Sequence, residues 1–435
     1  MTFIPSIGSA VGPIVAVLLG AALFSYLLTP RVRRVVLRHR IVDRPGARRI
    51  NRRPIPRSGG LAVAASFLFV AGLFLIVNDQ ANLIPVPPSL RPLDVAALLF
   101  GGAVAAALGA MDDLFNLRAR WQFLGQFALA AGAVVLGIGI DIVNHPFRPG
   151  VLVFPGIIAI GFTIFWIMGM INSINWIDGL DGLSSGVSII AAVTLGLISL
   201  STRVNQPLIA VLCFILAGAL FGFLRWNFYP ARIFAGTSGV QFVGYTLAVL
   251  SILGTAKVAV ALLVLGIPII DTFWIIVRRL YQGRSPFTPD RQHIHHRLLD
   301  LGLSHRQTVL VIYGLCAALS VLALVLTGAS LLYTFLVVFI AAGLVLFLPT
   351  RGDFGRPDEL EAEAYEPAPA VASSGPVASE SIAPERATQQ QIAAKRAAAD
   401  TVAPQPMAPG PSASNSTDGL DTAGYDPGPA VSKPG

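Results

Sequence analysis

The sequence predicts an all-α polytopic membrane protein with about eleven transmembrane helices. Apolar residues make up 54% of the 435 positions, charged residues only 12%, and the mean hydropathy is +0.70. Soluble domains carry roughly twice as much charge. The apolar residues form long runs with few charges, and a helix needs about 20 such residues to cross a bilayer.

The eleven runs follow one another through the first 350 residues. In chain order they cover residues 11–29, 60–77, 94–111, 121–140, 151–171, 184–201, 207–224, 238–254, 257–277, 308–326 and 331–349. The first run has no basic leader before it and no small-residue cleavage site after it, so we expect a retained helix. Cys213 and Cys316 fall inside runs, where a thiol packs as a small apolar residue, and we expect no disulfide.

The placement of basic residues predicts how the helices are oriented, because Lys and Arg are retained on the cytoplasmic side of a membrane. Segment 30–59 contains eleven Arg residues and segment 278–306 contains six. The alternate loops carry one basic residue each, at Arg91, Arg148, Arg203 and Lys257. We therefore expect the N-terminus outside and the C-terminus in the cytoplasm. The Arg-rich segment fits anionic lipid headgroups better than nucleic acid, and we expect no nucleic-acid partner.

The composition changes near residue 351, which predicts a domain boundary. Residues 351–435 are rich in Ala, Pro, Ser, Gly and Glu and have few bulky apolar side chains to bury. We expect residues 1–350 to form the membrane domain and 351–435 to form a disordered cytoplasmic tail.

The acidic residues of the membrane part gather on the predicted cytoplasmic side. Asp112 and Asp113 end the third run, Asp178 and Asp181 follow the fifth, and Asp290 follows the ninth. Carboxylates are costly near lipid, so their gathering at one surface predicts a polar site there.

Asp271 differs from the other acids because it lies inside the ninth run, about one turn after Pro268. An ionisable group within a span either has a function or is paired with another charge. Arg278, two turns further on, is a candidate structural partner. The sequence leaves both interpretations open.

The stretch "NSINWIDGLDGL" carries a polar residue at every third position, at Asn172, Asn175, Asp178 and Asp181. On a helix or a helical turn this spacing puts neighbouring members close to one face. Helix caps and Asx turns account for one or two such residues but not for four. A row of oxygen ligands without thiolates favours a hard cation, so we expect Mg²⁺, or Mn²⁺ in its place.

Three histidines, His293, His295 and His296, lie between Arg291 and Arg297. Zinc is the first interpretation of clustered histidines. It is disfavoured here because no Cys or Glu lies nearby and the Arg residues oppose a dication. Imidazole beside guanidinium suits an anion such as a diphosphate. We expect His305, further along, to be a solvated loop residue.

These motifs resemble those of the polyprenyl-phosphate N-acetylhexosamine-1-phosphate transferases. The resemblance runs from about Asp43 to His305 through "DRPGARRINRRPIPRSGG", "DDLFNLRARWQFLGQ", "NSINWIDGLDGL", "GFLRWNFYPARIFAGTSG", "PIIDTFWIIVRRL" and "SPFTPDRQHIHHRL". It implies transfer of a sugar 1-phosphate from a UDP-N-acetylhexosamine to undecaprenyl phosphate at the cytoplasmic face of the plasma membrane, with release of UMP and use of Mg²⁺. The HIHH form is similar to the branch that starts cell-surface polymers with N-acetylglucosamine.

The resemblance also implies roles for individual residues. Asp112 and Asp113 match an aspartate pair that activates the lipid phosphate, either as a base or through a covalent intermediate. The residues matching substrate contacts are Asn172, Asp178, Asp181, Asp290, His293, His295, His296 and Arg297, and those matching metal ligands are Asn175 and Thr237. We also consider a homodimer as a candidate assembly.

Three positions depart from the family pattern. Thr237 stands where the family usually has the metal-binding Asp, Gln122 where it has a Lys, and Asn51 where it has a His. Loss of an anionic ligand weakens the binding of Mg²⁺. An alternative to an active transferase is therefore a catalytically impaired paralogue that binds lipid phosphate or nucleotide. A transporter or an intramembrane protease fits less well, because most of the acids lie at the ends of runs on one side.

Overall fold

The computed structural model describes residues 7–43, 54–145, 150–202, 204–254, 257–281, 283, 293–326 and 329–347. Asn51, Asp290 and the predicted tail 351–435 lie outside these residues. The predictions made for them stay predictions.

The described part of the chain is mainly helical, which confirms the predicted all-α class. Its thirteen helices are α1 (Ile7–Arg38), α2 (Gly60–Ala81), α3 (Pro92–Phe115), α4 (Ala119–Val135), α5 (Gly156–Ile177), α6 (Leu183–Ser199), α7 (Pro207–Asn227), α8 (Gly236–Leu253), α9 (Lys257–Val264), α10 (Gly266–Tyr281), α11 (Ile294–Asp300), α12 (His305–Val325) and α13 (Ala329–Phe347). Two short antiparallel pairs of strands accompany them, β1 (Val42–Asp43) with β2 (Ile55–Pro56), and β3 (Ile142–Asn144) with β4 (Val151–Val153).

Seven of the described helices, α1, α2, α3, α5, α7, α8 and α12, are long and apolar enough to cross a membrane. The α9 and α10 helices pass the same test together but are bent by 79° at the break between them. The helices α6 and α13 are apolar but shorter. A polytopic membrane protein is therefore confirmed, whereas the count of eleven requires α4, α6 and α13 to cross as well and stays a prediction.

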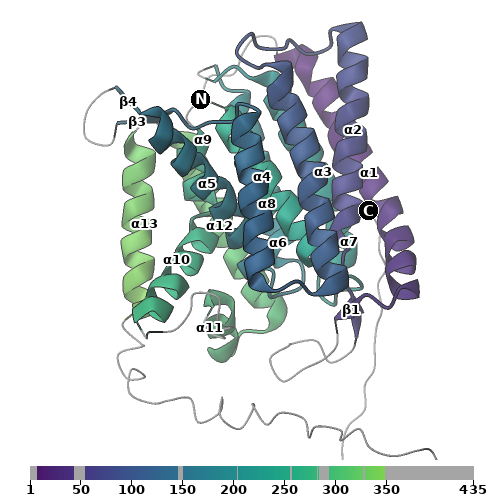
Figure 1. The fold of residues 1–435 in the computed structure, drawn as a ribbon, viewed down its shortest axis with the longest axis vertical. Helices are drawn as coiled ribbons and strands as arrows, with labels where there is room; N and C mark the ends of the chain where they lie inside the picture. The colour runs from purple at the N-terminus through teal and green to yellow at the C-terminus, as the bar shows by residue number, and fades with distance from the viewer. Residues whose placement is uncertain are drawn as a thin grey trace, which may run out of the picture. The chain divides into compact units, whose positions relative to one another are not determined.

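The most deeply buried helices are α7 and α8. The α7 helix packs against α1 and α6, and α8 packs against α3 and α5 (Figure 1). The outer helices instead expose large apolar side chains such as Phe100, Val135 and Ile157. In a bilayer these side chains face acyl chains, which are as apolar as the residues themselves.

The two ends of the helices carry different structures. Figure 1 shows β1 and α11 at one end and β3 and β4 at the other. At the first end, main-chain hydrogen bonds join the start of α2 to the residues before α8. Gly59 N donates to Phe234 O at 2.8 Å, and Gly60 N donates to Ala235 O at 2.8 Å. This junction fixes where α8 begins.

The α3 helix brings the first pair of predicted site residues to the same end. It begins at Pro92, a favoured first helical residue because proline has no N–H to leave unpaired. It ends at Phe115, and the residue that caps it, Asn116, has a φ of 48° in the left-handed region. The helix thus continues beyond the predicted limit at residue 111, and Asp112 and Asp113 lie in its last turn.

Candidate active site

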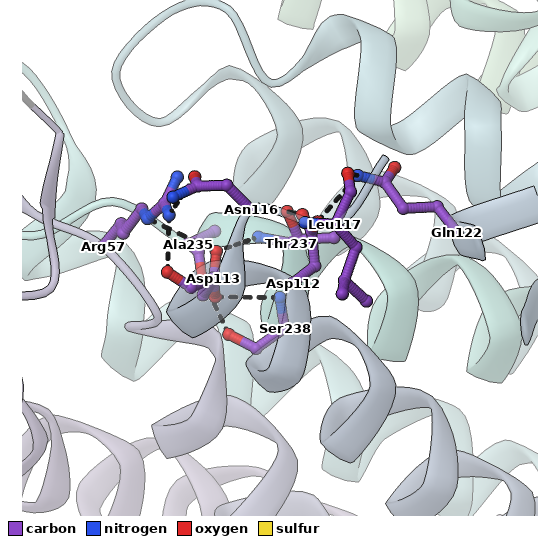
Figure 2. A network of polar contacts seen from close by, with 9 residues as sticks. All are labelled: Arg57, Asp112, Asp113, Asn116, Leu117, Gln122, Ala235, Thr237 and Ser238. Atoms are coloured by element: carbon purple, nitrogen blue, oxygen red, sulfur yellow. Dashed lines mark hydrogen bonds and ion pairs between the residues drawn. The ribbon is translucent and has the colours of Figure 1, made fainter. Parts of the chain in front are cut away.

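Asp113 joins the end of α3 to the start of α8 (Figure 2). Its carboxylate is buried and accepts hydrogen bonds from the main-chain nitrogens of Thr237 at 2.9 Å and Ser238 at 3.1 Å. A carboxylate at the N-terminus of a helix also interacts favourably with the helix dipole. Asp113 is therefore held rigidly between the two helices.

Asp112 is held by two of the three positions that depart from the family pattern, Thr237 and Gln122. One carboxylate oxygen, Oδ2, accepts from the Thr237 hydroxyl at 2.6 Å. The other, Oδ1, accepts from Gln122 Nε2 at 2.7 Å and from Leu117 N at 2.9 Å. These partners are neutral donors, and they fix the orientation of the carboxylate without adding charge.

Arg57 supplies a positive charge beside the aspartate pair. Its Nη2 donates to the main-chain oxygen of Asp113 and, at 2.6 Å, to Asn116 Oδ1. Its Nε lies 3.9 Å from Asp113 Oδ1. The sequence analysis did not single out Arg57, although it stands within one of the motifs that carry the resemblance.

Gly236 allows α8 to start this close to Asp113. Its φ is +71°, in the left-handed region, and a Cβ atom there would lie 2.6 Å from Asp113 Oδ2 and 2.5 Å from Ser58 N. Both the backbone conformation and the space therefore require glycine.

The polar residues at three-residue spacing lie in the last turns of α5 and just after it. Asn172 and Asn175 lie in its last turns, Asp178 caps it, and Asp181 lies in the following turn. Asn172 Nδ2 donates to Gln126 Oε1 at 2.8 Å, which joins this row of four polar residues, the polar stripe, to α4. All four residues line one or both of the cavities described below.

The two acids of the stripe bind neighbouring elements. Asp178 accepts a hydrogen bond from the Ser184 hydroxyl in α6. Asp181 Oδ2 accepts from Ala231 N at 2.8 Å, and Asp181 N donates to His305 Nε2 at 2.9 Å. The expectation that His305 is a solvated loop residue is wrong, because it begins α12 and contacts the site.

The carboxyl groups of Asp113, Asp178 and Asp181 lie close enough to influence one another's ionisation. Burial raises the pKa of Asp178, which lies just beyond α5, to about 7, and the charges of Asp113 and Asp181 add to the effect, while the hydrogen bond from Ser184 opposes it. Burial likewise raises the pKa of Asp181. Burial is the largest cause for both acids, because it disfavours the ionised form of a carboxyl group. A bound cation would favour the ionised form.

The histidine cluster lies in and before α11. His293 Nδ1 lies 2.9 Å from Asp271 Oδ2, so the buried acid of the ninth predicted span pairs with His293. His295 is buried, and burial together with the nearby histidines lowers its pKa well below the usual value. It is therefore neutral at physiological pH. Arg297 lies in the same short helix.

Two cavities open side by side among these residues. The first has a volume of about 300 Å³ and is lined by one guanidinium group, by acids and by neutral groups that carry oxygen: Arg57, Asp113, Asp178, Asp181, Asn175 and Thr237 are among them. The second has a volume of about 400 Å³ and is lined by amides, imidazoles, an aromatic ring and a guanidinium group: Gln122, Asn172, His293, His295, Trp176 and Arg279 are among them. Both are bordered by Asn175, Asp178, Gly179 and His296. The end of α5 therefore forms the boundary between them.

The first cavity fits a hard divalent cation. Its candidate ligands are carboxylates and neutral oxygens, with no sulfur among the lining residues. Asn175 and Thr237, the predicted metal ligands, line it together with Asp178. A second group, Asp271, His293 and His295, has potential ligand atoms within 4.8 Å of one another. Asp271 Oδ1 accepts from Ile294 N there, and Oδ2 lies 2.9 Å from His293 Nδ1.

Trp176 and Arg279 are site residues that sequence reasoning missed. The Arg279 guanidinium lies over the Trp176 ring, 5.5 Å from its centroid, and both line the second cavity. Trp176 stands inside the polar stripe, but an aromatic residue next to apolar ones gives no signal of exposure to a cavity. Their contact is visible only once α5 and α10 are packed together.

The fold and the site define a class: a polytopic membrane protein whose acid-lined cavity and imidazole-lined cavity adjoin at one end of its helices. Residues 95–255 match the sequence model of glycosyl transferase family 4. The chain belongs to this family.

Three relatives show how far the similarity extends. The chain is 33% identical over 331 residues to a probable undecaprenyl-phosphate N-acetylglucosaminyl 1-phosphate transferase of Bacillus subtilis, covering 74% of this chain and 86% of that one. It is 30% identical to the decaprenyl-phosphate N-acetylglucosaminephosphotransferase of Mycolicibacterium smegmatis, covering 68% and 77%. It is 29% identical to the undecaprenyl-phosphate alpha-N-acetylglucosaminyl 1-phosphate transferase of Yersinia pestis, covering 70% and 81%.

Proposed function

We propose that the protein transfers N-acetylglucosamine 1-phosphate from a UDP-sugar to undecaprenyl phosphate, releases UMP and thereby starts a cell-surface polysaccharide. The observation that carries the proposal is the pair of adjoining cavities, one lined by Asp113 and the acids after α5 and the other by the histidines. Two phosphate-bearing substrates require two such subsites with a common boundary. The names of the relatives support this choice of substrates.

In this reaction an oxygen of the lipid phosphate attacks the phosphorus that bears the sugar. The bond from that phosphorus to the bridging oxygen breaks, and UMP leaves with the bonding electrons. A phosphate monoester has a second pKa of about 6, so the lipid phosphate is already mostly dianionic at neutral pH. We therefore assign Asp112 and Asp113 to orienting the reacting groups and the cation, because their oxygens are already engaged by fixed donors.

The cation that we propose is Mg²⁺, with Mn²⁺ as a substitute. Bound in the first cavity it would neutralise charge on the reacting phosphates. Asp178 and Asp113 would hold it with Asn175, and Thr237 would contribute a neutral oxygen. Arg57 would add positive charge at the same place. This set matches the preference of Mg²⁺ for a few carboxylates together with substrate oxygens.

The second cavity suits the UDP-sugar. Asn172 and Gln122 offer amide groups for a nucleobase, and Trp176 offers an aromatic face. The imidazoles of His293, His295 and His296 line the same cavity and can donate to a diphosphate. We assign Asp290 and Arg297 to the same substrate.

The site end of the helices faces the cytoplasm in this proposal, with the protein in the plasma membrane and the N-terminus outside. Arg33 in α1 donates from Nε to Arg232 O at 3.0 Å, next to the loop that binds Asp181. The Arg-rich end of α1 therefore lies at the site. The positive-inside rule then places that end in the cytoplasm. A homodimer stays a prediction.

The test is release of UMP by the purified full chain in nanodiscs with UDP-N-acetylglucosamine, undecaprenyl phosphate and Mg²⁺. We expect turnover that Asp112→Asn and Asp178→Asn each reduce by at least a hundredfold. Asp178 lines the acid-lined cavity, and the Asp112 carboxylate accepts a hydrogen bond from Thr237, which lines it too. The matched control is Asp79→Asn, which removes an exposed acid near the end of α2 and is expected to leave the rate unchanged. Absence of turnover with every divalent metal would reject the proposal.

A catalytically impaired paralogue is the second candidate, and Thr237 is the observation that favours it. A neutral hydroxyl contacts Asp112 where the family pattern has a carboxylate. The variant Thr237→Asp separates the two candidates. A large gain in UMP release over the wild type supports impairment, whereas robust wild-type turnover that Asp112→Asn abolishes rejects it.

A further inference from the structure

We propose that Asp271 is a positioning residue. It fixes the orientation of the His293 imidazole so that Nε2 of that ring can contact a ligand in the second cavity. The identity of the ligand, the diphosphate of the UDP-sugar, rests on the proposed function. The contact between Asp271 and His293 does not.

Both oxygens of Asp271 are engaged at the start of α11. Oδ2 lies 2.9 Å from His293 Nδ1, and Oδ1 accepts from Ile294 N at 2.9 Å. The Asp271 carboxylate on α10 therefore contacts two consecutive residues, the ring of His293 and the main-chain nitrogen of Ile294. Rotation of the ring about χ2 would break the first of these bonds.

The chemistry of the pair sets the role of each ring nitrogen. An ionised carboxylate only accepts, so His293 Nδ1 is the donor in this contact. A ring that also donates from Nε2 to an anion carries hydrogen on both nitrogens, as imidazolium does, and the carboxylate beside Nδ1 stabilises that cation. A second-sphere carboxylate commonly fixes the tautomer and orientation of a functional histidine in this way. His293 lines the second cavity, where an anionic ligand would bind.

The burial of Asp271 argues against a purely incidental contact. Its side chain is 2% exposed and lies in α10, a helix within the membrane part, while the His293 side chain is 12% exposed. Placing a carboxylate there is costly unless hydrogen bonds satisfy it. Both of its oxygens are satisfied by the histidine segment.

The neighbours of His293 hold the same ring orientation. The ring stacks on His295 with centroids 5.3 Å apart and an interplanar angle of 13°, and it meets Trp176 edge-on at 6.3 Å. His295 is itself confined, because its Nε2 would lie 2.5 Å from a Cβ atom at Gly179. Asp271 thus fixes one edge of a ring whose faces are already packed.

The test is Asp271→Asn in the full chain, reconstituted in nanodiscs. The asparagine oxygen still accepts from Ile294 N, but its NH₂ group cannot accept from His293 Nδ1–H. In ¹⁵N-histidine spectra, with the His293 signals identified by their loss in His293→Gln, we expect a protonated Nδ1 in the wild type and an unprotonated Nδ1 in the variant. Asp94→Asn is the matched control, because Asp94 is a buried, hydrogen-bonded acid at the other end of the helices.

Binding of UDP-N-acetylglucosamine, measured by calorimetry, gives the second readout. We expect Asp271→Asn to weaken binding about tenfold, the effect of one misdirected charge-assisted hydrogen bond. It should raise the KM for the UDP-sugar and leave the KM for undecaprenyl phosphate within twofold. In the His293→Gln background the same substitution should have no further effect, because the two residues act through one contact.

Three results would overturn the inference. One is an unchanged Nδ1 signal in Asp271→Asn, and another is an effect on binding that adds fully to that of His293→Gln, as expected of a structural role alone. The third is stoichiometric zinc in the purified wild type that Asp271→Asn removes, which would make the Asp271, His293 and His295 group a metal site. If no UDP-sugar yields UMP, the proposed function fails, yet the spectra still decide the Asp271–His293 contact.

Discussion

Thr237 contacts Asp112 through a hydroxyl where the family pattern has a carboxylate. We expect loss of this hydroxyl to lower the rate of turnover. Thr237→Val keeps the volume but leaves Asp112 Oδ2 without its 2.6 Å donor. Loss of a hydrogen bond to a charged group is worth about 1.5–3 kcal/mol, so UMP release should fall roughly tenfold to a hundredfold. Thr237→Ser keeps the donor and should retain most activity. Equal losses in both variants would show that the hydroxyl is not what matters.

Asp178 gives the site a pH-dependent stability. Its pKa is about 7 in the folded protein and about 3.9 in an unfolded chain. The folded state therefore binds the proton more tightly, and the stabilisation that this gives is complete below about pH 4 and is lost as the pH rises through 7. Asp178→Asn removes the dependence, and its oxygen still accepts from Ser184.

Without divalent metal, we therefore expect the Tm of Asp178→Asn relative to the wild type to rise between pH 5 and pH 8. Mg²⁺ should raise the Tm of the wild type at pH 8 more than that of the variant, because ligand binding to the folded state stabilises it. The same Tm difference at both pH values would contradict this account of Asp178.

At the residue scale the sequence predicts the kind of each side chain in the site but not its partner. The three-residue spacing of the stripe and the clustered histidines follow from local sequence, and the structure places them around adjoining cavities. The bond from Thr237 to Asp112 joins residues 125 positions apart. Such pairs depend on the packing of α3 against α8, which no local pattern encodes.

At the scale of elements, the start of α8 is the feature most sensitive to substitution. Gly236→Ala would place a side chain on a backbone with φ of +71° and 2.6 Å from Asp113 Oδ2. We expect a lower Tm and loss of most UMP release, because the turn and the carboxylate cannot both keep their positions. Gly132→Ala in α4 meets no atom within 4 Å and is the control. A fully active Gly236→Ala variant would contradict the assigned geometry.

Helix limits are where the sequence prediction differs most from the structure. The predicted span 257–277 is divided into α9 and α10, with a bend of 79° between them. Pro268 explains the break, because it has no N–H to donate to the carbonyl of Val264. The apolar composition of the run does not reveal such a break, because apolar residues continue on both sides of it. The bend lies nearly two turns before Asp271.

At the scale of the whole molecule, the proposed orientation makes opposite ends of the helices accessible from opposite sides of the membrane. Val151 in β4 is 58% exposed at one end, and Leu301 after α11 is 76% exposed at the other. Cys213 and Cys316 are buried, so the native chain should label poorly with a maleimide. In intact cells an impermeant maleimide should label Val151→Cys and not Leu301→Cys. The reverse pattern would invert the topology.

The most direct test of the central claim is to follow the donor phosphate. UDP-N-acetylglucosamine labelled with ³H in the sugar and ³²P in the phosphate that bears it is incubated with the full chain, undecaprenyl phosphate and Mg²⁺. We predict a lipid product that carries both labels, formed one-for-one with UMP and lost in Asp112→Asn. Release of UDP with a lipid that carries the sugar label alone, or no labelled lipid with any divalent cation, would contradict the account.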